Sequence, residues 1–373
     1  MKTIMDTGCH VAAYATKCAR VDVVAAYPIT PQTSVMEAIA EMVEKGEMKA
    51  KFLPVEGEHS AMAATVAACA TGARVFTATS SQGLLYMHEV LHMAAGGRLS
   101  VVMANVNRGV MAPWTLMADH QDSLSQRDTG WLQYYCSTNQ EIFNTILQAY
   151  KVAETVNIPV MVNFDGFTLS HCMMPFQIPE QEVIDQFLPP CDPDWYLDPA
   201  HPSSFSNVTE AKEYAPFRQM LADDTLGALP VVKQAAADYR ELTGFWDGDT
   251  IETYRLEDAE AVVFAMGAMS SEVRVSIDKL RQEGIKIGLL RLRLFRPFPE
   301  ADIIAALPKN AQVLVLDRNY NFGHEGGILA SELKSALFGH RNDVTVKNRV
   351  MGIGGVDVTW QFMADELRAM LAE

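Results

Sequence analysis

The sequence lacks the closely spaced cysteines that bind metals or build disulfide frameworks. Its six cysteines are Cys9, Cys18, Cys69, Cys136, Cys172 and Cys191. No two of them form a CxxC pair, and most lie among apolar or small residues, as in ATVAACATG. Such surroundings are typical of reduced, buried thiols. The pattern therefore argues against a disulfide scaffold, a zinc site or an iron–sulfur cluster held by this chain.

Basic residues are also scarce. The chain has 30 Lys and Arg against 46 Asp and Glu, which gives a formal net charge of −16. Nucleic acids and anionic membrane surfaces are bound by basic faces, so both are disfavoured as partners. An acidic protein can still bind a phosphate-bearing cofactor through backbone N–H groups.

Long apolar runs are missing as well. The opening segment MKTIMDTG has no apolar region of the kind found in secretory signals, and no run approaches the length of a membrane span. These observations predict a cytoplasmic protein without a membrane segment.

The first 110 residues contain four apolar runs that each lead into a short polar loop. VDVVAAYPITP reaches Thr30, KFLPVEGEHS reaches Glu58, RVFTATSSQG reaches Ser81 and Gln82, and LSVVMANVNRG reaches Arg108. In a parallel α/β sheet the carboxyl ends of the strands line one edge, where ligands bind. These side chains are therefore predicted to converge on one site.

The composition along the chain predicts three parts. Strand and helix patterns alternate through residues 1–190, which indicates a parallel α/β domain. Residues 191–258 begin with a stretch rich in proline, aspartate and serine and continue as a charged helical linker. Residues 259–373 repeat the strand–helix alternation, so we expect a second, smaller α/β domain with its own core.

Taken singly, each motif also has a structural explanation. Thr30, between two prolines in YPITP, has the position of a helix cap. Glu56 and Glu58 precede a helix, where acidic residues complement its dipole. The alternative for Glu58 is a partly buried carboxylate that hydrogen-bonds a ring nitrogen of a cofactor. TSSQG, at Ser81 and Gln82, suits backbone contact with a ligand but is a common kind of turn.

Arg108 has two interpretations of its own. It can grip a ligand carboxylate in bidentate fashion. It can equally pair with a structural acid, because Asp119, Asp122 and Asp128 lie close in sequence. A fifth strand-like run, IPVMVNFDGF, ends at Asp165, for which we expect a structural role.

A metalloprotease-like pattern occurs at His88, Glu89 and His92, which spell H-E-V-L-H. Both imidazoles share one helix face, but the downstream third-ligand pattern is missing. A zinc hydrolase is thus a remote alternative, and we expect no metal bound by this chain.

As a set, the motifs resemble one known family. YPITPQTSVMEAI, VEGEHSAMAA, TATSSQGLLYMHEVL, ANVNRG, DHQDSLSQRDTGW, NFDGFTLSH, RLRLFRPFP and DRNYNFGHEGG occur in the order found in α subunits of 2-oxoacid:ferredoxin oxidoreductases. The similarity covers almost the whole chain, and pyruvate:ferredoxin oxidoreductases are most similar. It implies a pyrimidine-side thiamine-diphosphate-binding domain followed by a transketolase-C-terminal-like domain.

The resemblance also implies the reaction and the partners. Members of the family oxidatively decarboxylate a 2-oxo acid with coenzyme A to an acyl-CoA and CO2, and pass the electrons to ferredoxin. The thiamine diphosphate is shared with a β subunit that binds its diphosphate and Mg²⁺. γ and ferredoxin-like δ subunits complete the complex, and [4Fe–4S] clusters lie on partner chains. The lack of a convincing GDG motif and of cysteine clusters here agrees with that division.

Site roles carry over at the matching positions. Glu58 resembles the carboxylate that bonds N1′ of the thiamine pyrimidine. Thr30 and Arg108 resemble the residues that hold the carbonyl and carboxylate of the 2-oxo acid. Ser81 and Gln82 match cofactor-binding positions.

Two departures affect these expectations. Gly8 to His10 replace a Gly-Asn-x segment, so any role of that Asn is in doubt. Gly109 follows Arg108 where a larger residue is usual, and we expect it to open space beside the substrate. That space would admit a bulkier acid, aryl such as phenylglyoxylate or branched-chain, in place of pyruvate.

Overall fold

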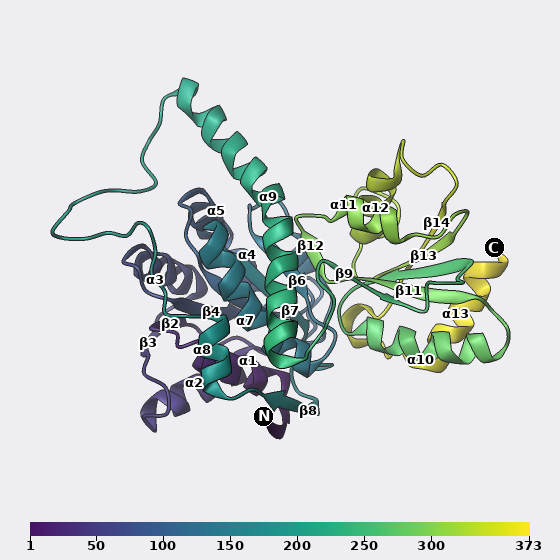
Figure 1. The fold of residues 1–373 in the computed structure, drawn as a ribbon, viewed down its shortest axis with the longest axis horizontal. Coiled ribbons are helices and arrows are strands. Elements are labelled where there is room, and N and C mark those ends of the chain that lie inside the picture. Colours follow the sequence, from purple (N-terminus) through teal and green to yellow (C-terminus); the bar gives the residue numbers. More distant parts are fainter.

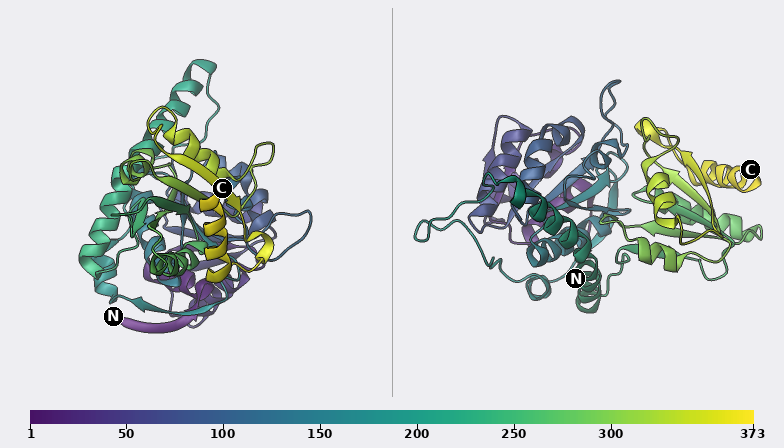
Figure 2. Two further views of the ribbon diagram at one scale, coloured as in Figure 1. Left: turned by 90° about the vertical axis from the view of Figure 1, so that its right-hand side faces the viewer. Right: turned by 90° about the horizontal axis from the view of Figure 1, so that it is seen from above.

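The computed structural model describes residues 1–373 and contains two α/β units that lie side by side (Figures 1 and 2). The larger unit carries a seven-stranded sheet and the smaller a five-stranded sheet. The N-terminus lies on the larger unit and the C-terminus on the smaller one. The mixed α/β fold with parallel sheets confirms the predicted fold class.

The seven-stranded sheet has the order β12-β6-β7-β5-β4-β2-β3. Its strands are β2 (Val23–Ala26), β3 (Lys51–Pro54), β4 (Val75–Thr79), β5 (Val102–Asn107), β6 (Leu132–Tyr135), β7 (Val160–Asp165) and β12 (Leu294–Arg296). All neighbours are parallel except β12, which is antiparallel to β6. The carboxyl ends of the parallel strands therefore meet at one edge.

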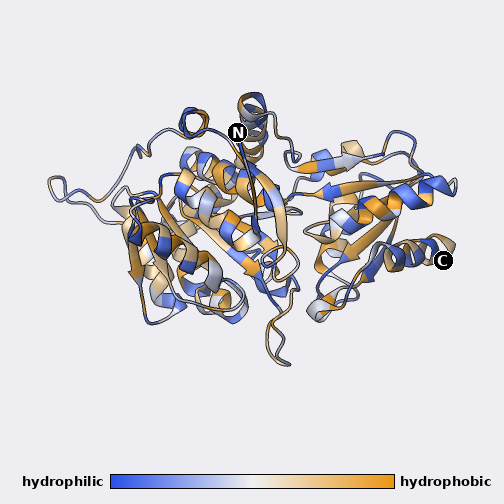
Figure 3. Cartoon of the chain, turned by 90° about the horizontal axis from the view of Figure 1, so that it is seen from below, coloured by the Kyte–Doolittle hydropathy of each residue, from blue (hydrophilic) through white to orange (hydrophobic).

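Helices cover both faces of this sheet. They are α1 (Gly8–Cys18), α2 (Thr33–Glu44), α3 (Glu58–Ala70), α4 (Ser81–Tyr86), α5 (His88–Gly96), α6 (Gln121–Leu124), α7 (Asn139–Val156), α8 (Gln181–Phe187) and α9 (Ala211–Thr243). Successive strand side chains point to opposite faces. Phe76 and Val102 pack with α1, α2 and α7, whereas Val75 and Met103 pack with α3 and α5. The central strands are accordingly buried on both sides and mostly apolar, whereas the helices have one apolar and one polar side (Figure 3).

The five-stranded sheet has the order β14-β13-β10-β11-β9. Its strands are β9 (Ile251–Tyr254), β10 (Ala261–Ala265), β11 (Ile287–Leu292), β13 (Gln312–Asp317) and β14 (Thr345–Val350). Helices α11 (Glu300–Ala306) and α12 (Ile328–Leu337) pack on one face, and α10 (Met269–Gln282) and α13 (Trp360–Ala372) on the other. A short 3₁₀ helix, η1 (Ile353–Gly355), follows β14.

One strand from the second half of the chain, β12, joins the larger sheet at the junction of the two units. β11 lies in the smaller sheet, and β12, which follows it directly along the chain, lies in the larger. Arg293 lies between them, fully buried, and bonds Glu141, Thr145 and Gln148 of α7. β9 joins the smaller sheet although it precedes residue 259. The division of the chain into residues 1–190, 191–258 and 259–373 stays a prediction.

Three local features complete the larger unit. β1 (Lys2–Thr7) and β8 (Met173–Ile178) form an antiparallel ribbon that alternation alone did not indicate. The segment LLYMHEVLH contributes to two helices, α4 and α5, which meet at Met87. The N-terminal part of α9 and the preceding loop extend away from the body (Figure 1).

No helix of the chain is both long and apolar enough to span a bilayer.

Candidate functional site

The predicted site residues follow four adjacent strands of the seven-stranded sheet. Arg108 follows β5, Ser81 and Gln82 follow β4, Thr30 follows β2 and Glu58 follows β3. β2 and β4 are parallel neighbours, but the sheet is extended in opposite directions from them. β4 leads on to β5 at one side, and β2 leads on to β3 at the other. Such a reversal opens a crevice outside the carboxyl ends of the strands, where α/β proteins bind ligands.

Arg108 joins three of these loops through its guanidinium. Its Nη1 donates to the Thr30 carbonyl at 2.8 Å, and its Nη2 donates to Gln82 Oε1 at 3.0 Å. Its Nε donates to the Thr115 carbonyl at 3.2 Å. No carboxylate pairs with it, so the alternative of a structural ion pair is wrong. A guanidinium has five N–H donors, so two remain for a ligand.

The surroundings of Arg108 increase its value as an anion-binding group. The residue is buried, with 3% of its surface exposed. Burial lowers the pKa of its guanidinium, and the negative charge of Asp122 opposes that shift. The guanidinium carbon, Cζ of Arg108, lies over the Trp114 ring, 5.6 Å from the centroid of the ring. A buried cation with unused donors favours a ligand carboxylate.

Thr30 contributes its backbone carbonyl to this cluster. Its side chain is exposed, and its hydroxyl makes no hydrogen bond within the chain. The hydroxyl is therefore free for a ligand. The alternative of a helix cap is wrong, because Gln32 occupies the N-cap position of α2 and forms no side-chain capping bond there.

Glu58 is the first residue of α3 and is buried, with 8% exposed. Its carboxylate lies beside the first turn of α4. A Cβ at Gly83 would come 2.7 Å from Glu58 Oε1 and 2.4 Å from Thr79 Oγ1. No donor within the chain bonds the Glu58 carboxylate, whereas the exposed Glu56 accepts from Ser60 at 2.7 Å. A buried carboxylate without a donor requires one from outside the chain.

Asp122 organises the site, although sequence reasoning treated it only as a possible partner of Arg108. Its fully buried carboxylate accepts from the Ser81 N–H at 3.0 Å and the Arg108 N–H at 3.1 Å. The Asn107 side chain donates to it at 2.8 Å. Burial raises its pKa to about 6. Nothing in the segment DHQDS distinguishes it from Asp119, because its role depends on the order of β4 and β5 in the sheet.

Gly109 does not open space beside Arg108, contrary to our expectation. A Cβ there would lie 2.5 Å from Thr115 Cγ2 and 3.2 Å from Asp119 Oδ2. The glycine instead lets the loop of residues 111–117 approach, and its N–H donates to the Met117 carbonyl at 2.9 Å. That loop exposes Met111, Trp114, Leu116 and Met117.

Asp165 lies outside this cluster and has the structural role that we expected. It is fully buried and bonds His120 at 3.0 Å, Arg318 at 2.8 Å and the Ala268 N–H at 2.7 Å. Burial opposes its ionisation, but Arg318 and His120 outweigh burial and hold its pKa well below the usual range. Since Ala268 and Arg318 belong to the smaller unit, Asp165 links the two units.

His88 and His92 face one another on α5, with ring centroids 4.9 Å apart. No group of three or more His, Cys, Asp or Glu side chains in residues 1–373 is placed to hold a metal ion. The pair therefore lacks the third ligand that a zinc hydrolase needs.

Comparison with known proteins first defines the class. The family model described as "Pyruvate flavodoxin/ferredoxin oxidoreductase, thiamine diP-bdg" matches residues 14–236. The model described as "Pyruvate:ferredoxin oxidoreductase core domain II" matches residues 259–363. The larger unit is thus a thiamine-diphosphate-binding unit of an oxidoreductase.

Curated relatives then define the family. Ketoisovalerate oxidoreductase subunit VorA of Pyrococcus horikoshii is 47% identical over 354 residues, covering 95% of this chain and 90% of the relative. Pyruvate synthase subunit PorA of Methanocaldococcus jannaschii is 43% identical over 356 residues, covering 94% and 90%. The chain belongs to the α subunits of the 2-oxoacid:ferredoxin oxidoreductases, and is a subunit of a multi-subunit enzyme.

Solved structures agree in fold. The 2-oxoglutarate:ferredoxin oxidoreductase from Magnetococcus marinus superposes with a TM-score of 0.77 at 18% identity, covering 99% of this chain and 65% of that one. A split-gene transketolase superposes with a TM-score of 0.55 at 11% identity, covering 98% and 97%.

The residues present fit the pyrimidine end of thiamine diphosphate. Beside the donor-free Glu58 carboxylate, the buried atoms Thr79 Oγ1, Ser80 Oγ and Gln82 Nε2 have no partner within the chain. Buried polar atoms are rarely left unpaired. A group with both donors and acceptors, such as an aminopyrimidine ring, matches this set.

Proposed function

We propose that this chain supplies the pyrimidine-side half of a thiamine-dependent active site that acts on a short 2-oxo acid. The observation that carries the proposal is the Arg108 guanidinium, which joins the Thr30 and Gln82 loops while keeping two donors unused. Glu58 follows the strand next to that of Thr30. Together they form half of a site at one sheet edge, and the other half belongs to a partner subunit.

Each side chain has a distinct role in this proposal. Glu58 accepts a hydrogen bond from N1′ of the pyrimidine and holds a proton there. Arg108 binds the substrate carboxylate, and the Thr30 hydroxyl donates to the substrate carbonyl. Ser81 and Gln82 contact the cofactor, with Gln82 also orienting Arg108. Thiamine diphosphate, when bound, supplies the carbanion chemistry of decarboxylation.

The partners follow from what this chain lacks. A β subunit is proposed to bind the diphosphate and Mg²⁺, and γ and ferredoxin-like δ subunits to complete the complex. The [4Fe–4S] clusters then lie on partner chains, with ferredoxin as acceptor and coenzyme A as acyl acceptor. The exposed apolar loop of residues 111–117, next to Arg108, suits a subunit interface.

Two substrates are proposed for this site. Pyruvate is the first, in line with the motif resemblance. A branched-chain 2-oxo acid is the second, because the VorA relatives are 45–47% identical whereas the PorA relatives are 41–43% identical. Gly109 supports neither a branched-chain nor an aryl acid, since Thr115 fills the space beside it.

The test is a steady-state assay of the purified complex with coenzyme A, a viologen dye and a panel of pyruvate, 2-oxoisovalerate and phenylglyoxylate. Glu58→Gln should lower kcat at least about 100-fold, because it removes a group that holds the pyrimidine proton. Glu56→Gln, an exposed acid two residues earlier, is the matched control and should be unaffected. Full activity of Glu58→Gln would show that the assigned role is wrong.

A further inference from the structure

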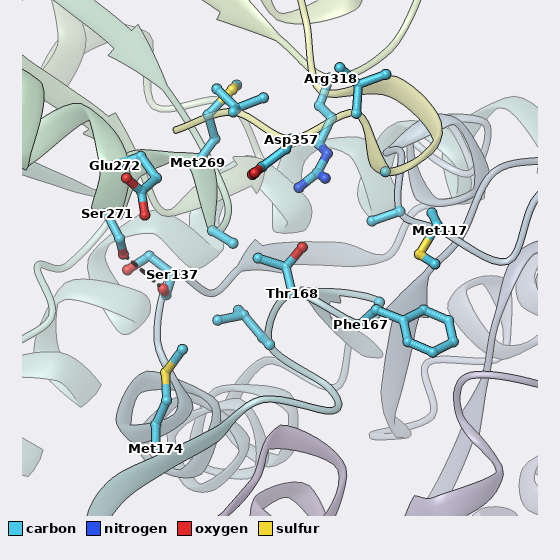
Figure 4. Close-up of a pocket in the computed structure, with 17 residues that line it drawn as sticks. Met117, Ser137, Phe167, Thr168, Met174, Met269, Ser271, Glu272, Arg318 and Asp357 are labelled. Carbon is cyan, nitrogen blue, oxygen red and sulfur yellow. Dashed lines mark hydrogen bonds between the residues drawn. The ribbon is translucent and has the colours of Figure 1, made fainter. Parts of the chain in front are cut away.

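A second crevice lies between the two units, at the carboxyl edge of the five-stranded sheet (Figure 4). Its volume is about 240 Å³. It is lined by the loop after β7, the start of α10, Arg318 after β13 and residues 355–358 after β14. None of the proposed thiamine-site residues lines it.

The topology of the smaller sheet marks this crevice as a ligand position. β10 and β13 are neighbours, but β10 leads to β11 on one side and β13 leads to β14 on the other. The order in which strands are added to the sheet therefore reverses between β10 and β13, as it does between β2 and β4 in the larger sheet. Open α/β sheets bind ligands at such reversals. The larger sheet holds the Thr30 and Gln82 cluster there, and the smaller sheet holds this crevice.

Charged groups of both signs reach the crevice with hydrogen-bonding capacity that the chain leaves unused. Arg318 donates through Nε to the Gly352 carbonyl and through Nη1 to Asp165, which leaves Nη2 without an acceptor. The carboxylates of Asp357 and Glu272 form no hydrogen bond or ion pair within the chain. In Figure 4, Arg318 and Asp357 enter from one side, Thr168 lies below them and Glu272 lies across the space.

Apart from Ser137 and Ser271, which bond one another, much of the remaining lining is apolar. Met117, Met174 and Met269 enter from three directions (Figure 4). Leu169 and Val358 also line the crevice. Methionines adapt to aliphatic groups of different shape. A volume of about 240 Å³ is below the range of about 300–1,000 Å³ typical of sites for drug-sized ligands, so the occupant is a small metabolite.

We propose that this crevice binds a zwitterionic α-amino acid with a short aliphatic side chain. Arg318 Nη2 and the Thr168 hydroxyl bind its carboxylate, and Asp357 binds its ammonium group with Glu272 opposite. The methionines and Val358 contact the aliphatic side chain. A simple carboxylic acid would leave Asp357 unmatched, and a simple amine would leave Arg318 Nη2 unmatched, so both charges are needed.

The crevice is connected to the loop beside Arg108. Met117 lines the crevice, while its carbonyl accepts from the Gly109 N–H. A Cβ at Gly355 would lie 2.5 Å from Met117 Cγ, so the loop and the crevice wall are in close contact. Ligand binding should therefore order residues 111–117 and change the KM for the 2-oxo acid. This effect on KM rests on the proposed function, but binding itself does not.

Calorimetric titration of the purified complex tests the proposal with L-valine, isobutylamine and isovalerate, which share one aliphatic group and differ in charge. L-valine should bind at least about tenfold more tightly than either singly charged compound, since each lacks one charge-assisted contact. Asp357→Asn and Glu272→Gln should weaken L-valine binding, Asp357→Asn by about tenfold. Glu257→Gln, an exposed carboxylate outside the crevice, is the control and should bind as wild type.

Three results would overturn the proposal: no binding of L-valine, equal binding of isovalerate, or unchanged binding in Asp357→Asn. Asp357 is exposed and unbonded, so its substitution should leave the fold intact, which circular dichroism checks. The Glu58→Gln complex should still bind L-valine. That result separates the crevice from the thiamine site, because failure of one assignment leaves the other measurable.

Discussion

Individual residues decide how this chain can bind an anion. Arg108 is buried and pairs with no carboxylate, and it is held by two backbone carbonyls and one amide oxygen. Neutral acceptors fix the orientation of its guanidinium without cancelling its charge. A guanidinium held in this way is prepared for a substrate carboxylate, and little side-chain entropy remains to be lost on binding.

Arg108→Lys should raise the KM for the 2-oxo acid by about 10- to 100-fold, because a single ammonium cannot hold the Thr30 and Gln82 loops and also bind a carboxylate. Steady-state kinetics of the complex check this change. Arg218→Lys, on the exposed part of α9, serves as control and should match wild type. An unchanged KM in Arg108→Lys would exclude it from substrate binding.

At the scale of elements, strand order decides which loops meet. The Asp122 carboxylate links the loops that follow β4 and β5, because it accepts hydrogen bonds from the backbone N–H groups of both Ser81 and Arg108. The site thus depends on a carboxylate that touches neither proposed ligand. Asp122 is a positioning residue.

Asp122→Asn should lower kcat/KM by about 10- to 100-fold, because the asparagine NH2 group faces N–H donors that need an acceptor. The pKa of Asp122 is raised to about 6, so its protonation should produce an acidic limb near pH 6 in the wild-type rate profile. That limb should be missing in the variant.

A raised pKa also means that ionisation of Asp122 opposes folding. The contribution of protonated Asp122 to the stability of the fold is therefore lost as pH rises through about 6.

Asp128→Asn, at an exposed side chain six residues later, provides the comparison and should keep the wild-type profile. Rate profiles between about pH 5 and 8 measure both variants. The persistence of the acidic limb in Asp122→Asn would assign that limb to another group.

At the scale of the whole molecule, buried charges join the two units. Asp165 bonds Arg318 and the Ala268 N–H of the smaller unit, and Glu141 bonds Arg291 and Arg293. Removing one partner of a buried pair leaves an uncompensated charge, which is costly. The two units are therefore expected to unfold together.

Asp165→Asn should lower the free energy of unfolding by about 3–5 kcal/mol at neutral pH, because Arg318 loses its buried partner. The pKa of Asp165 is lowered in the folded chain, so its contribution to stability is present above the unfolded pKa near about 4 and is lost as pH falls below it. Urea denaturation at neutral and acidic pH should show this acid-dependent loss in wild type and a smaller one in the variant. Asp185→Asn, in an exposed pair with Arg20, should change stability little.

The sequence by itself determined the α/β class and the strand-end loops from which the proposed site residues come. Those features are local: apolar runs predict strands, and polar loops follow them. Tertiary structure alone decided that Arg108 bonds Thr30 and Gln82 and no acid, that Asp122 fastens two strand ends, and that Thr115 fills the space at Gly109. These contacts depend on which strands are neighbours, and strand order is set by long-range packing that no local pattern encodes.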